Sequence, residues 1–206
     1  MPTLQESEIA ALLTPYLPPN TPSTLYTQLS TYLDLLLKWN ARTNLTAIRD
    51  PHEIVRRHFG ESLFAAQHLS PGTTLLDFGS GAGFPGLPIQ LYHPNLTVTL
   101  AESQNKKATF LREVIRTLGL KTEVWAARVE TMPPTRRFST VTLRAVDDMA
   151  VALPAASSRI APGGQLVILT TASAATVAAS ANSQTIPIPN SQSGILSLQT
   201  FHVEHQ

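Results

Sequence analysis

The sequence predicts an α/β protein with a mostly parallel sheet, helices on both faces of that sheet, and an N-terminal helical annex. Helical patterns fill residues 1–70 without a clear strand, whereas short β-rich runs alternate with helical runs from residue 73 onward. A glycine-rich loop follows the first β-rich run. Strands that alternate with helices are joined by right-handed crossovers and form a parallel sheet. We therefore expect an annex over residues 1–70 and one compact unit over residues 71–206.

Apolar residues recur at helical spacing in three segments of the annex. The first helix is expected to start from an N-cap at Ser7 and to run through Leu17, where two prolines end it. The second and third helices are expected over residues 24–39 and about 52–68.

The remaining elements follow in alternation. The predicted parallel strands cover residues 73–78, 96–101, 122–126, 140–143 and 165–170. The predicted helices between them start near residue 84 and cover residues 105–118 and 149–160. Residues 171–194 are rich in Ala, Ser, Thr, Asn and Gln, which predicts a loop or a weak helix. Residues 195–203 are expected to add a last, antiparallel strand at the far side of the sheet.

Composition excludes several classes of protein. The 206 residues include no cysteine, so disulfides, thiolate metal sites and cysteine nucleophiles are excluded. The first nine residues carry two glutamates and no basic residue, and no run of about 18 apolar residues occurs. We therefore expect no signal peptide, no membrane span and a cytoplasmic location.

The charge is unevenly distributed along the chain. Charged residues make up 14% of the chain, against a usual figure of roughly 25%, and the net charge is +1. Residues 1–37 carry three acidic and no basic residues, whereas residues 38–144 carry 14 basic and 8 acidic residues. Residues 38–144 therefore carry a net charge of +6, which is compatible with either phosphate contacts or an ordinary solvated surface.

The glycine-rich loop after residue 78 fits two classes of ligand. The spacing Gly81-x-Gly83-x-x-Gly86 matches a dinucleotide fingerprint, although Gly79 and Ser80 separate it from the strand. The phasing Asp77-x-Gly79-x-Gly81-x-Gly83 is similar to the first motif of S-adenosylmethionine-dependent methyltransferases. Glu102, at the end of the second strand, is placed to accept the ribose hydroxyls of either cofactor. The loop therefore favours the methyltransferase motif, and a dinucleotide-binding loop remains an open alternative.

Further motifs occur in a fixed order from residue 30 to residue 170. They are Trp39-Asn40, Asn44-Leu45-Thr46, His58-Phe59, Glu61-Ser62, Asp77 to Gly86, Glu102-Ser103, Lys106-Lys107, Phe110-Leu111-Arg112, Arg128-Val129-Glu130, Arg144-Ala145 and Pro162-Gly163-Gly164. As an ordered set they resemble the bacterial 16S rRNA guanine-N7 methyltransferase G family, historically called glucose-inhibited division protein B. The resemblance implies a Rossmann-like fold that binds S-adenosyl-L-methionine, with residues 71–206 as the methyltransferase domain.

The resemblance also implies a set of site residues. Val129 and Glu130 would border the adenine, and Arg144 would lie near the methionine end or the methyl-transfer site. The cofactor-binding set implied in full is Asp77, Gly79, Gly81, Gly83, Phe84, Glu102, Val129, Glu130 and Arg144. The residues implied toward the target base or the RNA are Asn40, Asn44, Thr46 and His58, of which Asn44 and His58, with Arg144, are the catalytic candidates.

The chemistry implied by the resemblance needs no general base, because guanine N7 already carries an in-plane lone pair. Alignment of the reacting atoms and electrostatic support should then supply most of the catalysis. We expect no metal site, and Arg144→Ala is expected to abolish methyl transfer with the fold intact. The implied partner is 16S rRNA in the small ribosomal subunit or in an assembly intermediate. The protein is expected to be a monomer.

Alternatives remain open from the residues. His58 is also interpretable as a helix residue hydrogen-bonded between the annex and the sheet. The family usually has aspartate where Glu61 stands, and it has a Lys-Gly pair where this chain has Thr170-Thr171. The missing lysine favours a ribosome-associated binding protein without turnover. The dinucleotide phasing favours a nicotinamide-dependent oxidoreductase.

Overall fold

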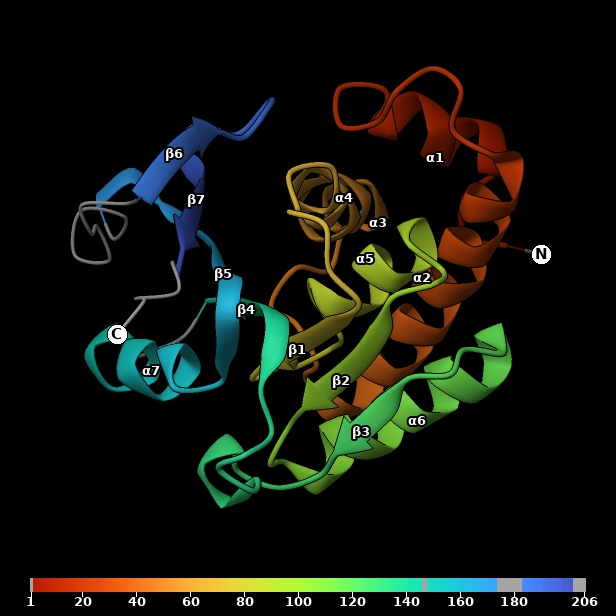
Figure 1. The fold of residues 1–206 in the computed structure, drawn as a ribbon. Coiled ribbons are helices and arrows are strands. Elements are labelled where there is room, and N and C mark those ends of the chain that lie inside the picture. Colours follow the sequence, from red (N-terminus) through yellow and green to blue (C-terminus); the bar gives the residue numbers. More distant parts are fainter. Residues whose placement is uncertain (1, 146–147, 174–182, 202–206) are drawn as a thin grey trace.

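The computed structural model describes residues 2–145, 148–173 and 183–201. Within these residues a seven-stranded sheet has the order β3-β2-β1-β4-β5-β7-β6 (Figure 1). Its strands are β1 Thr74–Phe78, β2 Thr97–Ala101, β3 Glu123–Trp125, β4 Phe138–Arg144, β5 Ile160–Thr171, β6 Ser183–Pro187 and β7 Gly194–Thr200. Strands β1 to β5 pair in parallel, whereas β7 is antiparallel to both β5 and β6. The predicted α/β class and the antiparallel last strand are confirmed.

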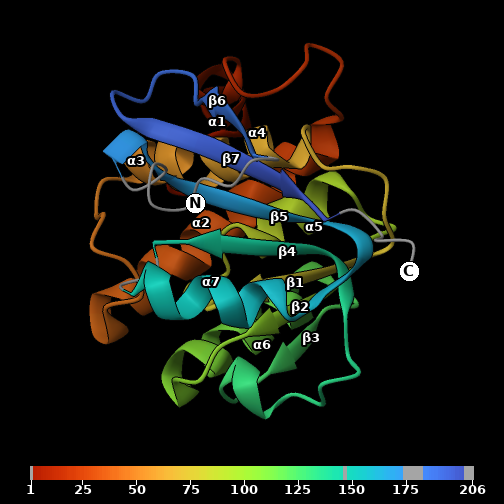
Figure 2. The ribbon, with the colours of Figure 1, turned by 60° about the vertical axis from the view of Figure 1, so that its left-hand side comes forward.

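Helices cover both faces of the sheet, as Figures 1 and 2 show. The helices are α1 Glu6–Leu13, α2 Ser23–Thr43, α3 Pro51–Glu53, the π-helix η1 Ile54–Gly60, α4 Glu61–Ala66, α5 Gly86–Tyr92, α6 Asn105–Leu118, the 3₁₀ turn η2 Val129–Thr131 and α7 Met149–Ser157. Helices α2, α4, α5 and α6 share one buried apolar cluster on one face, and α7 packs on the other face. None of the helices in the described ranges is long and apolar enough to span a membrane.

The annex differs from its prediction at two places. Helix α1 ends at Leu13 rather than Leu17, because Pro15 has no N–H to donate to the Ala11 carbonyl, which accepts from the Thr14 N–H instead. Its N-cap is Gln5, which makes no side-chain cap bond, so the predicted cap at Ser7 is wrong. The single helix predicted over residues 52–68 is instead α3, the π-helix η1 and α4 in sequence.

The C-terminal part of the sheet differs as well. Strand β5 starts at Ile160, five residues early, because a bulge admits Pro162 to Gly164 between the Phe138 and Thr140 pairings. Residues 183–187 form β6, so the loop or weak helix predicted there is wrong. This strand, and not β7, lies at the edge of the sheet. Residues 174–182 of the predicted loop and residues 202–203 of the predicted strand lie outside the described residues.

The buried core runs continuously across residue 70. Tyr32 of α2 and Phe59 of η1 lie with ring centroids 5.2 Å apart, and Tyr32 stacks on Phe84 of the glycine-rich loop at 5.4 Å. Tyr32 also donates a short hydrogen bond to the Ala82 carbonyl. The annex is therefore part of the layer that holds the loop, and the domain boundary at residue 70 stays a prediction.

Candidate active site

The glycines of the loop after β1 divide into two kinds. Gly79, Gly81 and Gly83 all have positive φ, at 72°, 58° and 92°. A Cβ at Gly79 would meet no atom within 4 Å, and one at Gly81 would meet only a backbone oxygen at 3.9 Å. A Cβ at Gly83 would instead lie 2.5 Å from both Leu87 and the Tyr32 hydroxyl. Gly79 and Gly81 therefore leave room above the loop, whereas Gly83 lets the loop pack on the annex, and its predicted contact with a cofactor stays a prediction.

Asp77 lies beneath the loop and is 1% exposed. Its Oδ1 accepts from the Thr142 hydroxyl at 2.8 Å, and its Oδ2 accepts from the Gly86 N–H at 3.1 Å. Burial raises the pKa of Asp77 to about 6 against the opposing effect of these hydrogen bonds. Because its carboxylate faces protein donors, Asp77 joins the loop to β4 and to the start of α5. Its predicted part in cofactor binding stays a prediction.

Glu102 fastens the other side of the loop. Its Oε2 accepts from the Gly81 N–H at 2.9 Å, and its Oε1 accepts from the Gln104 N–H at 2.7 Å. Each carboxylate oxygen can accept two hydrogen bonds, so both oxygens keep an acceptor site. Glu102 therefore fixes the loop and still has capacity for a hydroxyl ligand.

A cavity of about 410 Å³ opens at the carboxyl ends of β1 to β4. It is lined by Phe78, Gly79, Ala101, Ser103, Ala127, Arg128, Val129, Glu130, Asp148, Val151 and Ala152. Ligands of open α/β sheets bind at this edge, and the volume lies within the range of about 300 to 1,000 Å³ typical of ligand pockets. The predicted residues Gly79, Val129 and Glu130 are therefore brought together around one cavity.

Among the lining residues that the sequence did not single out, Asp148 and Val151 come from the start of α7. Asp148 caps α7, since its carboxylate accepts from the Val151 N–H at 3.1 Å. Val151, in the first turn of α7, is 60% exposed, although large apolar side chains are usually buried. Their position in the sequence could have indicated them, because they follow β4 where the carboxyl end of a parallel strand meets a helix.

Arg144, the last residue of β4, does not line this cavity. Its Nη2 donates to the Glu61 carboxylate and to the Arg57 carbonyl, both at 2.7 Å. Its Nη1 lies 3.3 Å from the His58 carbonyl and 3.4 Å from the Ser62 hydroxyl. These bonds satisfy carbonyls of the π-helix, where the change back to α-helical geometry leaves acceptors without their usual partners. Arg144 therefore clamps the annex to the end of β4.

His58 lies on the same side of the loop as Arg144. Its Nε2 shares a hydrogen bond of 2.7 Å with the Thr46 hydroxyl, and its ring stacks on Phe84 at 4.7 Å. Burial, with the charges of Arg144 and Arg57, lowers the pKa of His58 to about 3. Nδ1 is buried and has no hydrogen-bond partner among the described residues. The ring is neutral near pH 7. Its hydrogen bond stays within the annex and only its stack on Phe84 reaches the glycine-rich loop, so the predicted hydrogen bond between annex and sheet is not the one observed.

The loop after α2 holds the remaining predicted residues. Asn40 is buried, donates to the Thr46 and Ile48 carbonyls and accepts from the Thr46 N–H, so it shapes this loop. Asn44 is exposed at a left-handed C-cap with φ 47°, and its Oδ1 accepts from Arg49 at 2.6 Å. Asn44 is thus the open member of the group predicted to face RNA.

The predicted site residues therefore form two groups. The first lies at the cavity, which Gly79, Val129 and Glu130 line, and Glu102 joins this group through its hydrogen bond to the Gly81 N–H. The second contains the three catalytic candidates Arg144, His58 and Asn44, with Phe84 stacked between His58 and Tyr32. Phe84 is 7% exposed, so it belongs to the packing between annex and loop rather than to the cavity lining.

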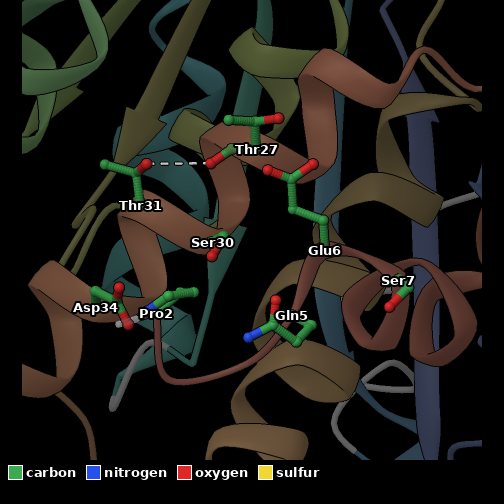
Figure 3. A pocket seen from close by; sticks show the side chains of 8 residues that line it. All are labelled: Pro2, Gln5, Glu6, Ser7, Thr27, Ser30, Thr31 and Asp34. Carbon is green, nitrogen blue, oxygen red and sulfur yellow. Dashed lines mark hydrogen bonds between the residues drawn. The ribbon is translucent and has the colours of Figure 1, made fainter.

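A larger cavity, of about 680 Å³, lies elsewhere, between the N-terminal segment, α1 and α2 (Figure 3). Its lining residues are Pro2, Gln5, Glu6, Ser7, Thr27, Ser30, Thr31 and Asp34. Two of them are acidic and the others carry no charge, and the set includes none of the predicted site residues. This cavity offers an anionic ligand no favourable charge.

Comparison with known proteins identifies the family of this chain. The family profile described as rRNA small subunit methyltransferase G matches residues 25–197. The chain belongs to the rRNA small subunit methyltransferase G family. The ribosomal RNA small subunit methyltransferase G of Chromobacterium violaceum is 42% identical to this chain over 142 residues, which cover 68% of this chain and 68% of the relative. That from Xanthomonas campestris is 42% identical over 139 residues, covering 67% of this chain and 65% of the relative.

Solved structures support the fold of this methyltransferase family. A 16S rRNA N2 methyltransferase of T. thermophilus, in complex with AdoMet and guanosine, has a TM-score of 0.55 at 18% identity. The match covers 69% of this chain and 43% of that chain. A ribosomal protein L11 methylase of Lactobacillus delbrueckii has a TM-score of 0.57 at 13% identity, covering 71% and 80%. The sheet of this methyltransferase family member is thus the Rossmann-like sheet of S-adenosylmethionine-dependent methyltransferases.

Proposed function

We propose that this chain transfers a methyl group from S-adenosyl-L-methionine to N7 of a guanine in 16S rRNA. The observation that carries the proposal is the cavity at the carboxyl ends of β1 to β4, bordered by Gly79 and by residues 127–130. Family membership supports the reaction class, and the AdoMet bound by the T. thermophilus relative of the fold supports the cofactor.

The residues around the cavity fit this cofactor. Any side chain at Gly79 would project into the space above the loop, which suits close approach of a ligand to the backbone. Val129 and the exposed Val151 offer apolar surface for an adenine ring, and Glu102 keeps acceptor sites for ribose hydroxyls. Arg128 and Glu130 form an exposed ion pair at the rim.

The chain's own residues have mainly a binding and orienting part in this chemistry. When bound, S-adenosylmethionine supplies a sulfonium methyl group, whose bond to sulfur breaks with its electron pair as the N7 lone pair forms the new bond. No proton leaves the base, so the depressed pKa of His58 is no obstacle to the reaction. We assign His58 and Arg144 as positioning residues, because their contacts are to protein groups, and Asn44 as a candidate contact to RNA.

The geometry disfavours the dinucleotide alternative. In that fingerprint the second glycine lets the backbone approach the pyrophosphate. Gly83 occupies that place here, and Tyr32, Leu87 and Leu111 cover it. The proposal also includes 16S rRNA of the small ribosomal subunit or of an assembly intermediate as partner, a monomeric state and a cytoplasmic location.

The test is methylation of small subunits and of 16S rRNA isolated from cells that lack this chain. Transfer of label from S-adenosyl-[methyl-³H]methionine, with mass mapping of the RNA fragments, is expected to find one N7-methylguanine. Calorimetry with S-adenosylhomocysteine and with NAD gives an independent measure of the cavity's ligand. Binding of NAD alone would support the oxidoreductase, and ribosome binding with an unchanged methylguanine pattern would support a binding protein without turnover.

A further inference from the structure

A second cavity, of about 330 Å³, lies at the same edge of the sheet, between the annex and the turn that joins β6 to β7. We call it the annex groove. Its lining residues are Tyr16, Glu53, Arg56, Arg57, Glu61, Asn190, Ser191, Gln192 and Ser193. The turn lies at the carboxyl edge because Gly194, which begins β7, pairs with Thr171 at the end of β5. Both cavities therefore open where parallel strands end.

The charges of the annex groove leave a positive excess at Arg57. Glu61 is 9% exposed and is paired at 2.7 Å with Arg144, which is 11% exposed. Glu53 is paired with Arg56 at 2.9 Å. Arg57 is 60% exposed, and its Nε lies 3.7 Å from the Glu61 carboxylate that Arg144 already neutralises. The two arginines and two glutamates of the lining balance, and Arg144, which pairs with Glu61 from outside the lining, brings the local sum to one positive charge. The most exposed of these three cations is Arg57.

The uncharged lining suits a phosphodiester backbone. Ser191, Gln192, Ser193 and Asn190 offer hydroxyl and amide groups, which together with arginine make most protein contacts to phosphate and sugar. Burial raises the pKa of Tyr16, so the phenol stays neutral. Together with the adjoining Arg144, the groove combines one net positive charge with neutral hydrogen-bonding groups, as a single phosphate contact requires.

The annex groove is coupled to the end of β4 through the backbone. The Arg57 carbonyl accepts from Arg144 Nη2 at 2.7 Å, so the residue that offers the positive charge is fixed to the strand beside the proposed cofactor cavity. An RNA strand that presents a base to that cavity has to cross the same edge of the sheet. A phosphate held at Arg57 would then set the position of the strand relative to β4.

We propose that the annex groove binds a backbone phosphate of the RNA substrate, with Arg57 as the principal contact and the 190–193 turn as polar support. The inference rests on the proposed function, because it specifies how the same RNA is held. It assigns to Arg57 a part in affinity and placement and none in the chemistry of methyl transfer.

The first test compares Arg57→Ala with Arg116→Ala as the matched control. Arg116 is exposed in the last turn of α6, away from the carboxyl edge, so the control removes an equal charge. We expect Arg57→Ala to weaken binding of small subunits by about tenfold and to reduce the slope of log K against log salt by about 0.7 to 0.9. The KM for RNA should rise while kcat and S-adenosylhomocysteine affinity stay unchanged. Equal salt slopes for the wild type and Arg57→Ala would overturn the inference.

A second pair of variants tests the turn without altering the annex. Gln192→Glu adds a negative charge inside the groove, and Gln184→Glu adds the same charge on the exposed strand β6. Only Gln192→Glu should weaken RNA binding, and thermal unfolding should show both variants folded. Equal effects of the two changes would contradict the groove. Failure of the wild type to methylate any RNA would instead overturn the proposed function, so the two failures are distinguishable.

Discussion

The two groups of residues at the carboxyl edge of the sheet are built differently. Around the cavity at the carboxyl ends of β1 to β4, Gly79 faces open space and Val151 is exposed. Around the annex, Arg144 and His58 are enclosed and bonded to protein groups. One group is arranged to receive a ligand and the other to fix the annex on the sheet. Residues that a family motif places together can thus contribute binding at one place and rigidity at another.

The largest expected effect that tests this contrast is at Arg144. Arg144→Ala leaves the Glu61 carboxylate buried without its partner at 2.7 Å, and removal of one member of a buried pair costs about 3 to 5 kcal/mol. We therefore expect a large loss of unfolding free energy, measured by urea denaturation, together with loss of methyl transfer. This revises the expectation from sequence that the fold stays intact.

The double variant Arg144→Met with Glu61→Gln serves as the control, because it removes both buried charges. It should recover much of the stability and little of the activity. If Arg144→Ala unfolds at the same urea concentration as the wild type, the arginine is not the clamp that we describe.

The next largest effect separates two glycines of one loop. Gly83→Ala places a Cβ 2.5 Å from Leu87 and the Tyr32 hydroxyl at a positive φ, so we expect a loss of about 2 to 4 kcal/mol in unfolding free energy. Gly79→Ala shares the strain of a positive φ, but its Cβ meets no atom within 4 Å, so it should lose less stability while it fills space beside the cavity. Its main effect should be S-adenosylhomocysteine affinity at least about tenfold weaker, equivalent to about 1.4 kcal/mol. The affinity is measured by calorimetry and the unfolding free energy by denaturation. If one variant lost more of both quantities than the other, the division of the loop would be contradicted.

The sequence was sufficient for the five parallel strands, for β7 and for the glycine-rich loop at the end of β1. Period-two runs and the glycine loop are local patterns, and Glu102, Val129 and Glu130 follow strands whose carboxyl ends share one edge. Strand β6 escaped prediction because its polar residues, Ser183 to Thr185, carry little apolar alternation and pair only with β7. The contacts of Arg144 and His58 depend on where a π-helix meets β4, which no local pattern specifies.

A smaller effect concerns the pH dependence of stability. The pKa of His58 is about 3 in the folded chain and about 6.5 when unfolded, so unfolding takes up a proton between these values. This lowers the unfolding free energy by about 1.4 kcal/mol for each unit that the pH falls. The pKa of Asp77 is about 6 in the folded chain and 3.8 when unfolded, so unfolding releases a proton between these values. The unfolding free energy therefore rises as the pH falls from 6 toward 4.

The two contributions therefore oppose each other between about pH 4 and pH 6. Asp77→Asn should make stability fall more steeply with acid than in the wild type, and His58→Gln should make it fall less steeply. Urea denaturation at pH 4, 5 and 6 measures each slope. A wild-type slope retained in both variants would show that neither group has the pKa that its burial implies.

The smallest effect on stability is expected at Asn44, which is the exposed member of the annex group. Glycine adopts the left-handed conformation of this C-cap freely, so Asn44→Gly loses only the bond to Arg49, worth less than about 1.5 kcal/mol. If Asn44 contacts RNA, the KM for RNA should rise in this variant while kcat and S-adenosylhomocysteine affinity stay unchanged. Asn44→Ala is the control for backbone strain, because it loses the same amide and should also lose stability. A fall in kcat with unchanged KM would place Asn44 beside the reacting atoms, and the annex would then hold catalytic as well as positioning residues.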